Sequence, residues 1–179
     1  MKKIRVIGLA MFALILSMPL LKAQDESQEK VIANSKEAKA AFLKADPSMT
    51  NLFKSAYGYA IFPKVGKGAA GVGGAAGNGA VFEKGKATGT AKLAQVTVGA
   101  QLGGQSYREV IFFESKEALE RFTDNKIEFS GQVSAVAAKS GASSNANYRE
   151  GVVVFTEERS GLMLEASLGG QKFTYKPLK

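Results

Sequence analysis

The side chains that could do chemistry in this chain of 179 residues are lysines, carboxylates, hydroxyls and tyrosines, because it has no His and no Cys. Ser-His-Asp triads, Cys-His pairs and zinc sites are therefore excluded. Ser27 and Lys30 match S-x-x-K, but no partner motif accompanies them. A glycosidase would need two facing carboxylates, and nothing pairs the acids on or beside the expected strands, which are Glu83, Glu114, Glu128 and Glu165. We expect no enzyme, no cofactor and no metal site.

Lysines are the chemically active groups that cluster. Six lysines stand between residues 54 and 92 against a single acid, Glu83. Such a cluster suits an anionic partner, such as phospholipid headgroups or another polyanion, although a solvated surface that only maintains solubility is the alternative. The candidate lipid-binding residues in this segment are Lys54, Lys64, Lys67, Lys84 and Lys86.

Residues 1–23 predict a secretory signal peptide. Basic residues at positions 2, 3 and 5 precede an apolar run over residues 6–21, which is shorter than the roughly 20 residues of a membrane-spanning helix. An uncleaved N-terminal anchor is the alternative. Cleavage removes four basic residues and no acid, so the net charge falls from +8 to +4. We expect an exported protein, periplasmic or peripheral on the cell envelope, for which nucleic acid is not a partner.

A glycine-rich segment follows the first expected strand. Residues 66–71 match G-x-G-x-x-G, but the glycines that come next cannot support the helix that a dinucleotide site requires. No acid lies about 20 residues further on, where the ribose would be bound. Glycine and alanine instead allow close approach of strands and tight bending of a sheet. We therefore expect these residues to lie inside strands.

Two helices are expected before this segment. Residues 27–45 repeat apolar or small side chains every three to four positions, which predicts a helix docked on the core or lying on a membrane surface. Asp46 followed by Pro47 predicts the N-cap and first turn of a second short helix. Residues 24–55 thus form an N-terminal helical segment.

Alternation of side chains predicts strands in the rest of the chain. Residues 93–102 predict a half-buried strand with Ala94, Val96 and Val98 on its apolar face. Further strands are expected at 107–113, 152–155, 162–168 and around 173–175, and a helix at 116–124 after Ser115. The small residues of 127–139 permit a strand or a helix, and we favour a strand. The expected fold is a single α+β domain. It has a glycine-rich antiparallel sheet or small barrel, with N-terminal helices and one further helix packed on it.

Several motifs resemble the SYLF domain, or Ysc84-like family. They are the Tyr-Gly-Tyr-Ala-Ile-Phe-Pro-Lys run at 57–64, the Gln-Leu-Gly-Gly-Gln run at 101–105, and residues 160–170. The resemblance places a SYLF-like core at residues 56–179. It implies a lipid-binding module without catalytic activity, whose eukaryotic members bind phosphoinositides and in some cases actin. Glu165 stands where the family has Gly, and the small-residue segment 129–141 lacks the usual Gly-Pro turn.

The sequence therefore leads to one main hypothesis and two alternatives. The main hypothesis is an envelope protein that binds anionic phospholipid through its basic glycine-rich region, with apolar insertion by the first helix. The first alternative is a periplasmic carrier of a small hydrophobic ligand. The second is a structural or assembly partner within the envelope.

Overall fold

The computed structural model describes residues 27–70, 72–98, 103–126, 136–137, 139–160 and 170–179. The predicted signal peptide and most of the ambiguous 127–139 segment lie outside these residues, as does the expected strand at 162–168. The elements in chain order are α1 (Gln28–Ala45), α2 (Met49–Ser55), β1 (Gly58–Ala70), β2 (Val72–Glu83), β3 (Lys86–Val98), β4 (Gly103–Phe113), α3 (Lys116–Thr123), β5 (Val136–Ala137), the 3-10 turn η1 (Ala142–Asn145), β6 (Val152–Ser160) and β7 (Gln171–Pro177).

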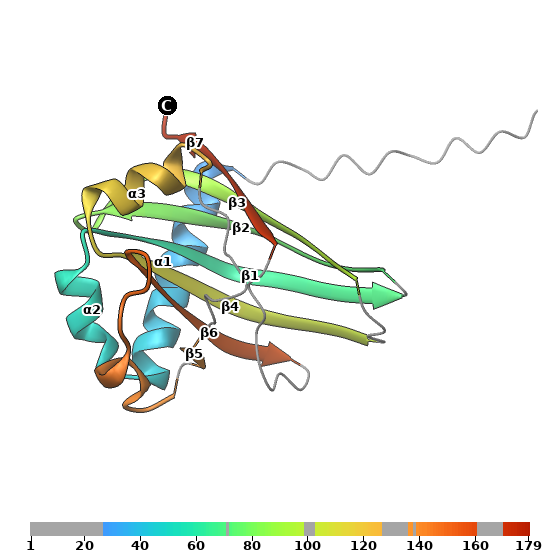
Figure 1. Ribbon diagram of the computed structural model, residues 1–179, viewed down its shortest axis with the longest axis horizontal. Helices are drawn as coiled ribbons and strands as arrows, with labels where there is room; N and C mark the ends of the chain where they lie inside the picture. Colours follow the sequence, from blue (N-terminus) through green and yellow to red (C-terminus); the bar gives the residue numbers. More distant parts are fainter. Residues whose placement is uncertain (1–26, 71, 99–102, 127–135, 138, 161–169) are drawn as a thin grey trace, which may run out of the picture.

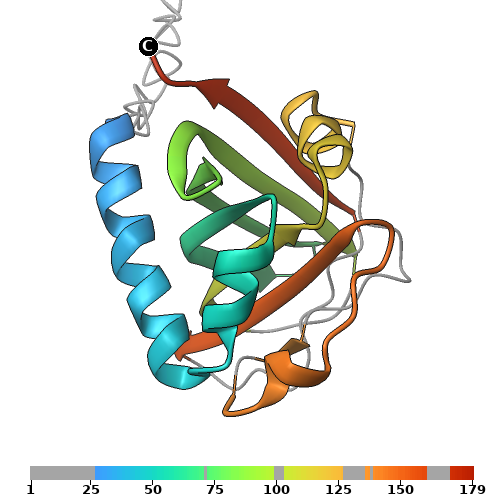
Figure 2. The same cartoon turned by 90° about the vertical axis from the view of Figure 1, so that its left-hand side faces the viewer.

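All strands join one sheet in the order β5-β6-β4-β1-β2-β3-β7. Six of them pair antiparallel, while the two-residue β5 runs parallel to β6. The sheet curls strongly, with α1 outside the curve and α3 at the opening between β6 and β7 (Figures 1 and 2). The expected α+β domain is confirmed. Of the two sheet forms expected from the sequence, the open sheet is correct, because the described strands do not close into a barrel.

Each face of the sheet has its own apolar core. On the convex face, α1 and α2 bury Val31, Phe42, Met49 and Phe53 against the sheet. On the concave face, α3 buries residues such as Phe122 against the interior of the curve, where the other large side chains are Phe62, Tyr107, Ile111, Phe113 and Phe173. The apolar stripe of α1 is thus docked on the sheet and is not exposed for membrane insertion. Among the described residues, no helix is long and apolar enough to cross a bilayer.

The glycine-rich segment forms β1 and β2, as expected from the small residues. At Gly79 a Cβ atom would lie 2.5 Å from the Ile61 carbonyl oxygen and 2.7 Å from the Phe62 ring, so only glycine fits this close approach. Strand β1 continues past Pro63 because the pairing register with β2 shifts between Ile61 and Lys64. A bulge of this kind accommodates a residue that lacks an N–H group.

The structure reverses the face predicted for β3. Leu93 and Gln95 are buried, with exposed fractions of 2% and 3%, whereas Val96 is 73% exposed. Ala94 is exposed on the same side as Val96. The prediction was wrong because small residues alternate on both sides of this strand. The aromatic residues of other strands, which fill the concave side, decide which side is covered.

Asp46 is not the N-cap of α2. Ser48 occupies that position without a side-chain cap, and Asp46 instead ends α1. Its buried carboxylate accepts hydrogen bonds from the backbone N–H groups of Ser48, Gly141 and Ser143. The side chain that was expected to start a helix therefore fastens the α1–α2 corner to the loop around η1, which is distant in sequence.

Candidate functional site

A row of polar side chains crosses four strands on the convex face, beside the part that α1 covers. Lys64 of β1 pairs with Asn78 of β2, Asn78 pairs with Lys92 of β3, and Lys92 pairs with Thr174 of β7. All four side chains are exposed. Directly paired residues project from the same face of a sheet, so this register brings Lys64 and Lys92 onto one surface.

The row lies within a wider surface of lysines and small residues. The next cross-strand row, two residues along each strand, contains Gly66, Ala76, Ala94 and Lys172, and Val96 projects beyond it. We call this surface the basic face. Its members are Lys64, Gly66, Ala76, Asn78, Lys92, Ala94, Val96, Lys172, Thr174 and Lys176. It combines four positive charges with one exposed branched apolar side chain.

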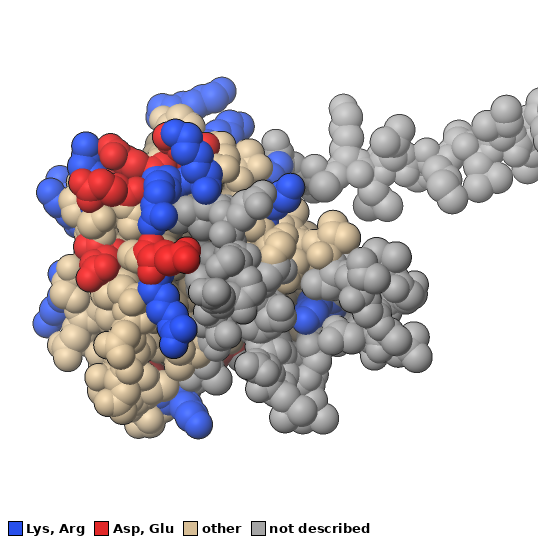
Figure 3. Space-filling view, viewed as in Figure 1, with Lys and Arg blue, Asp and Glu red and all other residues tan. Residues whose placement is uncertain are grey.

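Acidic side chains lie elsewhere on the described surface. Arg108 and Glu157, on the neighbouring strands β4 and β6, form an ion pair of 2.9 Å that neutralises both charges. The end of the molecule around α3 shows acidic and basic side chains intermixed (Figure 3), including the 2.9 Å pair of Lys116 with Glu120. Among the residues that form the basic face there is no carboxylate, so its own side chains carry a formal charge of +4.

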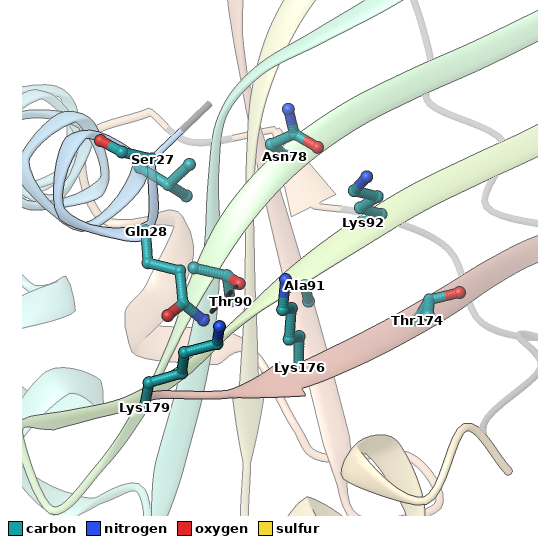
Figure 4. Close-up of a pocket in the computed structure, with 10 residues that line it drawn as sticks. Ser27, Gln28, Asn78, Thr90, Ala91, Lys92, Thr174, Lys176 and Lys179 are labelled. Carbon is teal, nitrogen blue, oxygen red and sulfur yellow. Dashed lines mark hydrogen bonds between the residues drawn. The ribbon is translucent and has the colours of Figure 1, made fainter. Parts of the chain in front are cut away.

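An open pocket of about 440 Å³ adjoins the basic face where the beginning of α1 meets the sheet (Figure 4). Its charged lining residues are Lys92, Lys176 and Lys179. Gln28 fixes this corner, because its side-chain amide donates hydrogen bonds to the hydroxyl of Thr90 at 3.4 Å and to the Pro177 carbonyl at 3.0 Å. The positive end of the α1 dipole adds to the lysine charges, so the pocket favours an anionic group.

The five lysines predicted from the sequence do not form one site. Lys64 lies on the basic face, whereas Lys67, three residues further on in a regularly paired stretch, is on the opposite side of β1. Lys54 is on α2. Lys84 and Lys86 lie at the β2–β3 turn, where Lys84 and Gly85 both have positive φ. That turn is six residues from Asn78 along β2, or about 20 Å.

The three lysines of the basic face that lay outside the prediction are Lys92, Lys172 and Lys176. A signal for the last two was present, because Lys172, Thr174 and Lys176 alternate with apolar or buried residues at the C-terminus. Such alternation predicts an exposed face of a strand but not the strand beside which it lies. The pairing of β7 with β3 supplies that information.

The described residues contain no group of three or more His, Cys, Asp or Glu side chains that could hold a metal ion. Two buried carboxylates have shifted pKa values. Burial raises the pKa of Glu109 to about 7. Burial also acts to raise the pKa of Asp46, but hydrogen bonds from Ser48, Ser143 and Gly141 outweigh it and lower the pKa to about 2. Glu109 lies inside the curve of the sheet and Asp46 at a helix corner, so the two do not form a catalytic pair.

Comparison with known proteins identifies relatives of the chain. Residues 94–177 match the Ysc84 family model, described as "Las17-binding protein actin regulator". A protein of Aeromonas veronii named beta cell expansion factor A is 31% identical over 175 residues, which covers 86% of this chain and 64% of that protein. The chain thus spans slightly less than two thirds of the length of this curated relative.

Proposed function

We propose that this chain, which belongs to the Ysc84 (SYLF) family, binds anionic phospholipid surfaces. The family is linked to lipid and actin binding and is not a known enzyme family. The observation that carries this proposal is the cross-strand row in which Lys64 and Lys92 flank Asn78 on one exposed surface. The protein acts at the cell envelope after export.

The basic face has the shape and charge that such binding needs. Four lysines project from strands of one sheet and so approach a membrane together. Each contributes roughly 1 kcal/mol near an anionic surface. Val96 adds an apolar contact, since its exposed side chain can enter the boundary between headgroups and acyl chains. This role replaces the insertion that was expected of the apolar stripe of α1.

The adjoining pocket is suited to one phosphoryl headgroup. Lys176 and Lys179 line it together with the side chains of Thr90 and Thr174, which can donate hydrogen bonds to phosphate oxygens. Surface binding is favoured over carriage of a hydrophobe because buried aromatic side chains pack against one another in the described part of the concave interior.

Cosedimentation with vesicles tests the proposal. The protein should bind vesicles that contain phosphatidylglycerol better than pure phosphatidylcholine vesicles, and binding should weaken as salt screens the lysines. The double variant Lys64→Gln, Lys92→Gln should lower the partition coefficient about thirtyfold, at roughly 1 kcal/mol for each lysine.

The matched control is Lys84→Gln, Lys86→Gln, which removes the same charge from the β2–β3 turn and should change binding much less. Equal loss in both variants would show that only net charge matters. Absence of any preference for anionic vesicles would refute phospholipid binding altogether.

A further inference from the structure

A buried hydrogen bond joins two strands that are not neighbours in the sheet. The side-chain amide of Gln171 on β7 donates to the carboxylate of Glu109 on β4, with 3.0 Å between Nε2 and Oε2. Both residues are completely buried. Strands β1, β2 and β3 separate β4 from β7 in the sheet order, so this bond spans the concave interior.

The described residues directly opposite Glu109 on the adjacent strands carry no positive charge. Opposite it on the adjacent strands are Phe62 of β1 and Thr156 of β6, neither of which is charged. The second carboxylate oxygen of Glu109 and the side-chain oxygen of Gln171 have no hydrogen-bond partner among the described residues. A buried ionised carboxylate with one oxygen unsatisfied is costly, and the protonated form costs less because it carries no charge.

The other titratable groups near Glu109 do not reverse this preference. Tyr107, on the same face of β4, is buried, and burial raises the pKa of its phenol, so it stays neutral. Lys67 lies two residues beyond Val65, the partner of Tyr107 on β1. Glu158 is the partner of Tyr107 on β6. Neither residue is therefore directly opposite Glu109. Burial raises the pKa of Glu109, and the hydrogen bond from Gln171 is the cause that opposes it.

We propose that Glu109 is a proton-binding site that couples the attachment of β7, and with it the basic face, to pH. Strand β7 is an edge strand, paired with β3 in the described sheet. Gln171 projects from the concave side of β7, where it is bonded to Glu109. Lys172 and Lys176, two lysines of the basic face, project from the opposite side of the same strand.

The direction of the pH effect on stability follows from the two protonation states of the Glu109 carboxyl group. The folded protein binds the proton more tightly than the unfolded chain does, so stability from this group is greatest at acidic pH and falls as pH rises toward neutrality. Ionisation favours loosening of β7, which exposes the carboxylate to water. The effect on vesicle binding rests on the proposed function, whereas the effect on stability does not.

Unfolding by urea at pH 5.5 and pH 8.5 tests the coupling to stability. In the wild-type protein the Glu109 contribution should raise the unfolding equilibrium constant about thirtyfold between these pH values. Glu109→Gln keeps the shape and the hydrogen bond without the charge, so this variant should lack that rise. Glu37→Gln, on the exposed side of α1, should retain it.

The carboxyl ¹³C chemical shift of Glu109 in the wild-type protein gives a second measurement that does not depend on the folding of a variant. A titration midpoint near neutral pH supports the proposal. A midpoint near 4.5, or the same pH dependence in Glu109→Gln as in the wild type, overturns it.

Binding to phosphatidylglycerol vesicles, whose charge is constant between pH 5.5 and 8.5, tests the coupling to the basic face. Wild-type binding should fall across this range while Glu109→Gln shows no fall. Binding that is strong but independent of pH overturns the coupling to the basic face. Absence of binding at both pH values overturns the proposed function instead, and the unfolding and chemical-shift measurements then decide the role of Glu109.

Discussion

The hydroxyl group of Ser35 on α1 donates a hydrogen bond to the backbone carbonyl of Ile61 on β1, with 3.0 Å between the two oxygens. The same hydroxyl accepts the N–H of Ala80 on β2 at 3.2 Å, and Ser35 is completely buried. Ile61 and Ala80 are paired directly before the register of β1 and β2 shifts. One helix side chain thus joins both strands at this point. This link positions α1 beside the bulge after which Lys64 begins the basic face.

Ser35→Ala should lower the free energy of unfolding by about 1–3 kcal/mol, because it removes the side-chain partner of a buried carbonyl and a buried N–H group. Urea denaturation measures this difference. Lys36→Ala, at the next and exposed position of α1, is the control and should remain within about 0.5 kcal/mol of the wild type. Equal stability of the two variants would contradict a structural role for the Ser35 hydroxyl.

Gly79→Ala should destabilise the protein by about 1–3 kcal/mol, since the new methyl group would overlap the Ile61 carbonyl and the Phe62 ring. Thermal unfolding measures the effect as a lower Tm. Gly66→Ala is the matched control on the neighbouring strand, where a Cβ atom has no neighbour within 4 Å. A similar drop in Tm for both variants would mean that loss of glycine itself, rather than the close approach, is responsible.

Asp46 should make folding sensitive to acid. The pKa of its carboxyl is about 2 in the folded protein and 3.8 without the fold, so the stability it contributes is present above about pH 4. This stability is lost as pH falls through 2. Urea unfolding at pH 5 and pH 2.5 should show a smaller pH dependence for Asp46→Asn than for the wild type. Asp124→Asn, at an exposed carboxylate, should not differ from the wild type in this dependence.

Val96→Asp should weaken binding to phosphatidylglycerol vesicles about tenfold, because it removes an apolar contact and adds a negative charge beside the lysines. Cosedimentation measures the change. Ser144→Asp adds the same charge at an exposed residue of η1, away from the basic face, and should alter binding little. Equal weakening by both substitutions would argue against contact between Val96 and the membrane.

Much of the fold could be predicted from local patterns. The helices over 28–45 and 116–123 formed where apolar residues repeat every three to four positions, and Ser115 caps the second one as expected. The small residues of 58–70 and 72–83 lie in strands, and the motifs of the SYLF family were recognised in the sequence. These features depend on neighbours within one helical turn or on alternate residues of a strand, so the sequence contains the information directly.

The functional surface depends on tertiary structure. Six lysines in one segment predicted an anionic partner, but side-chain alternation along β1 puts Lys64 and Lys67 on opposite sides of the sheet. The pairing of β7 with β3 brings Lys172 and Lys176 from the C-terminus beside Lys92. The bond between Glu109 and Gln171, which are 62 residues apart, arises in the same way. The sequence by itself determined the elements and the excess of lysine. Strand order and register decided which charges from distant segments share a face, because both depend on contacts between residues distant in the chain.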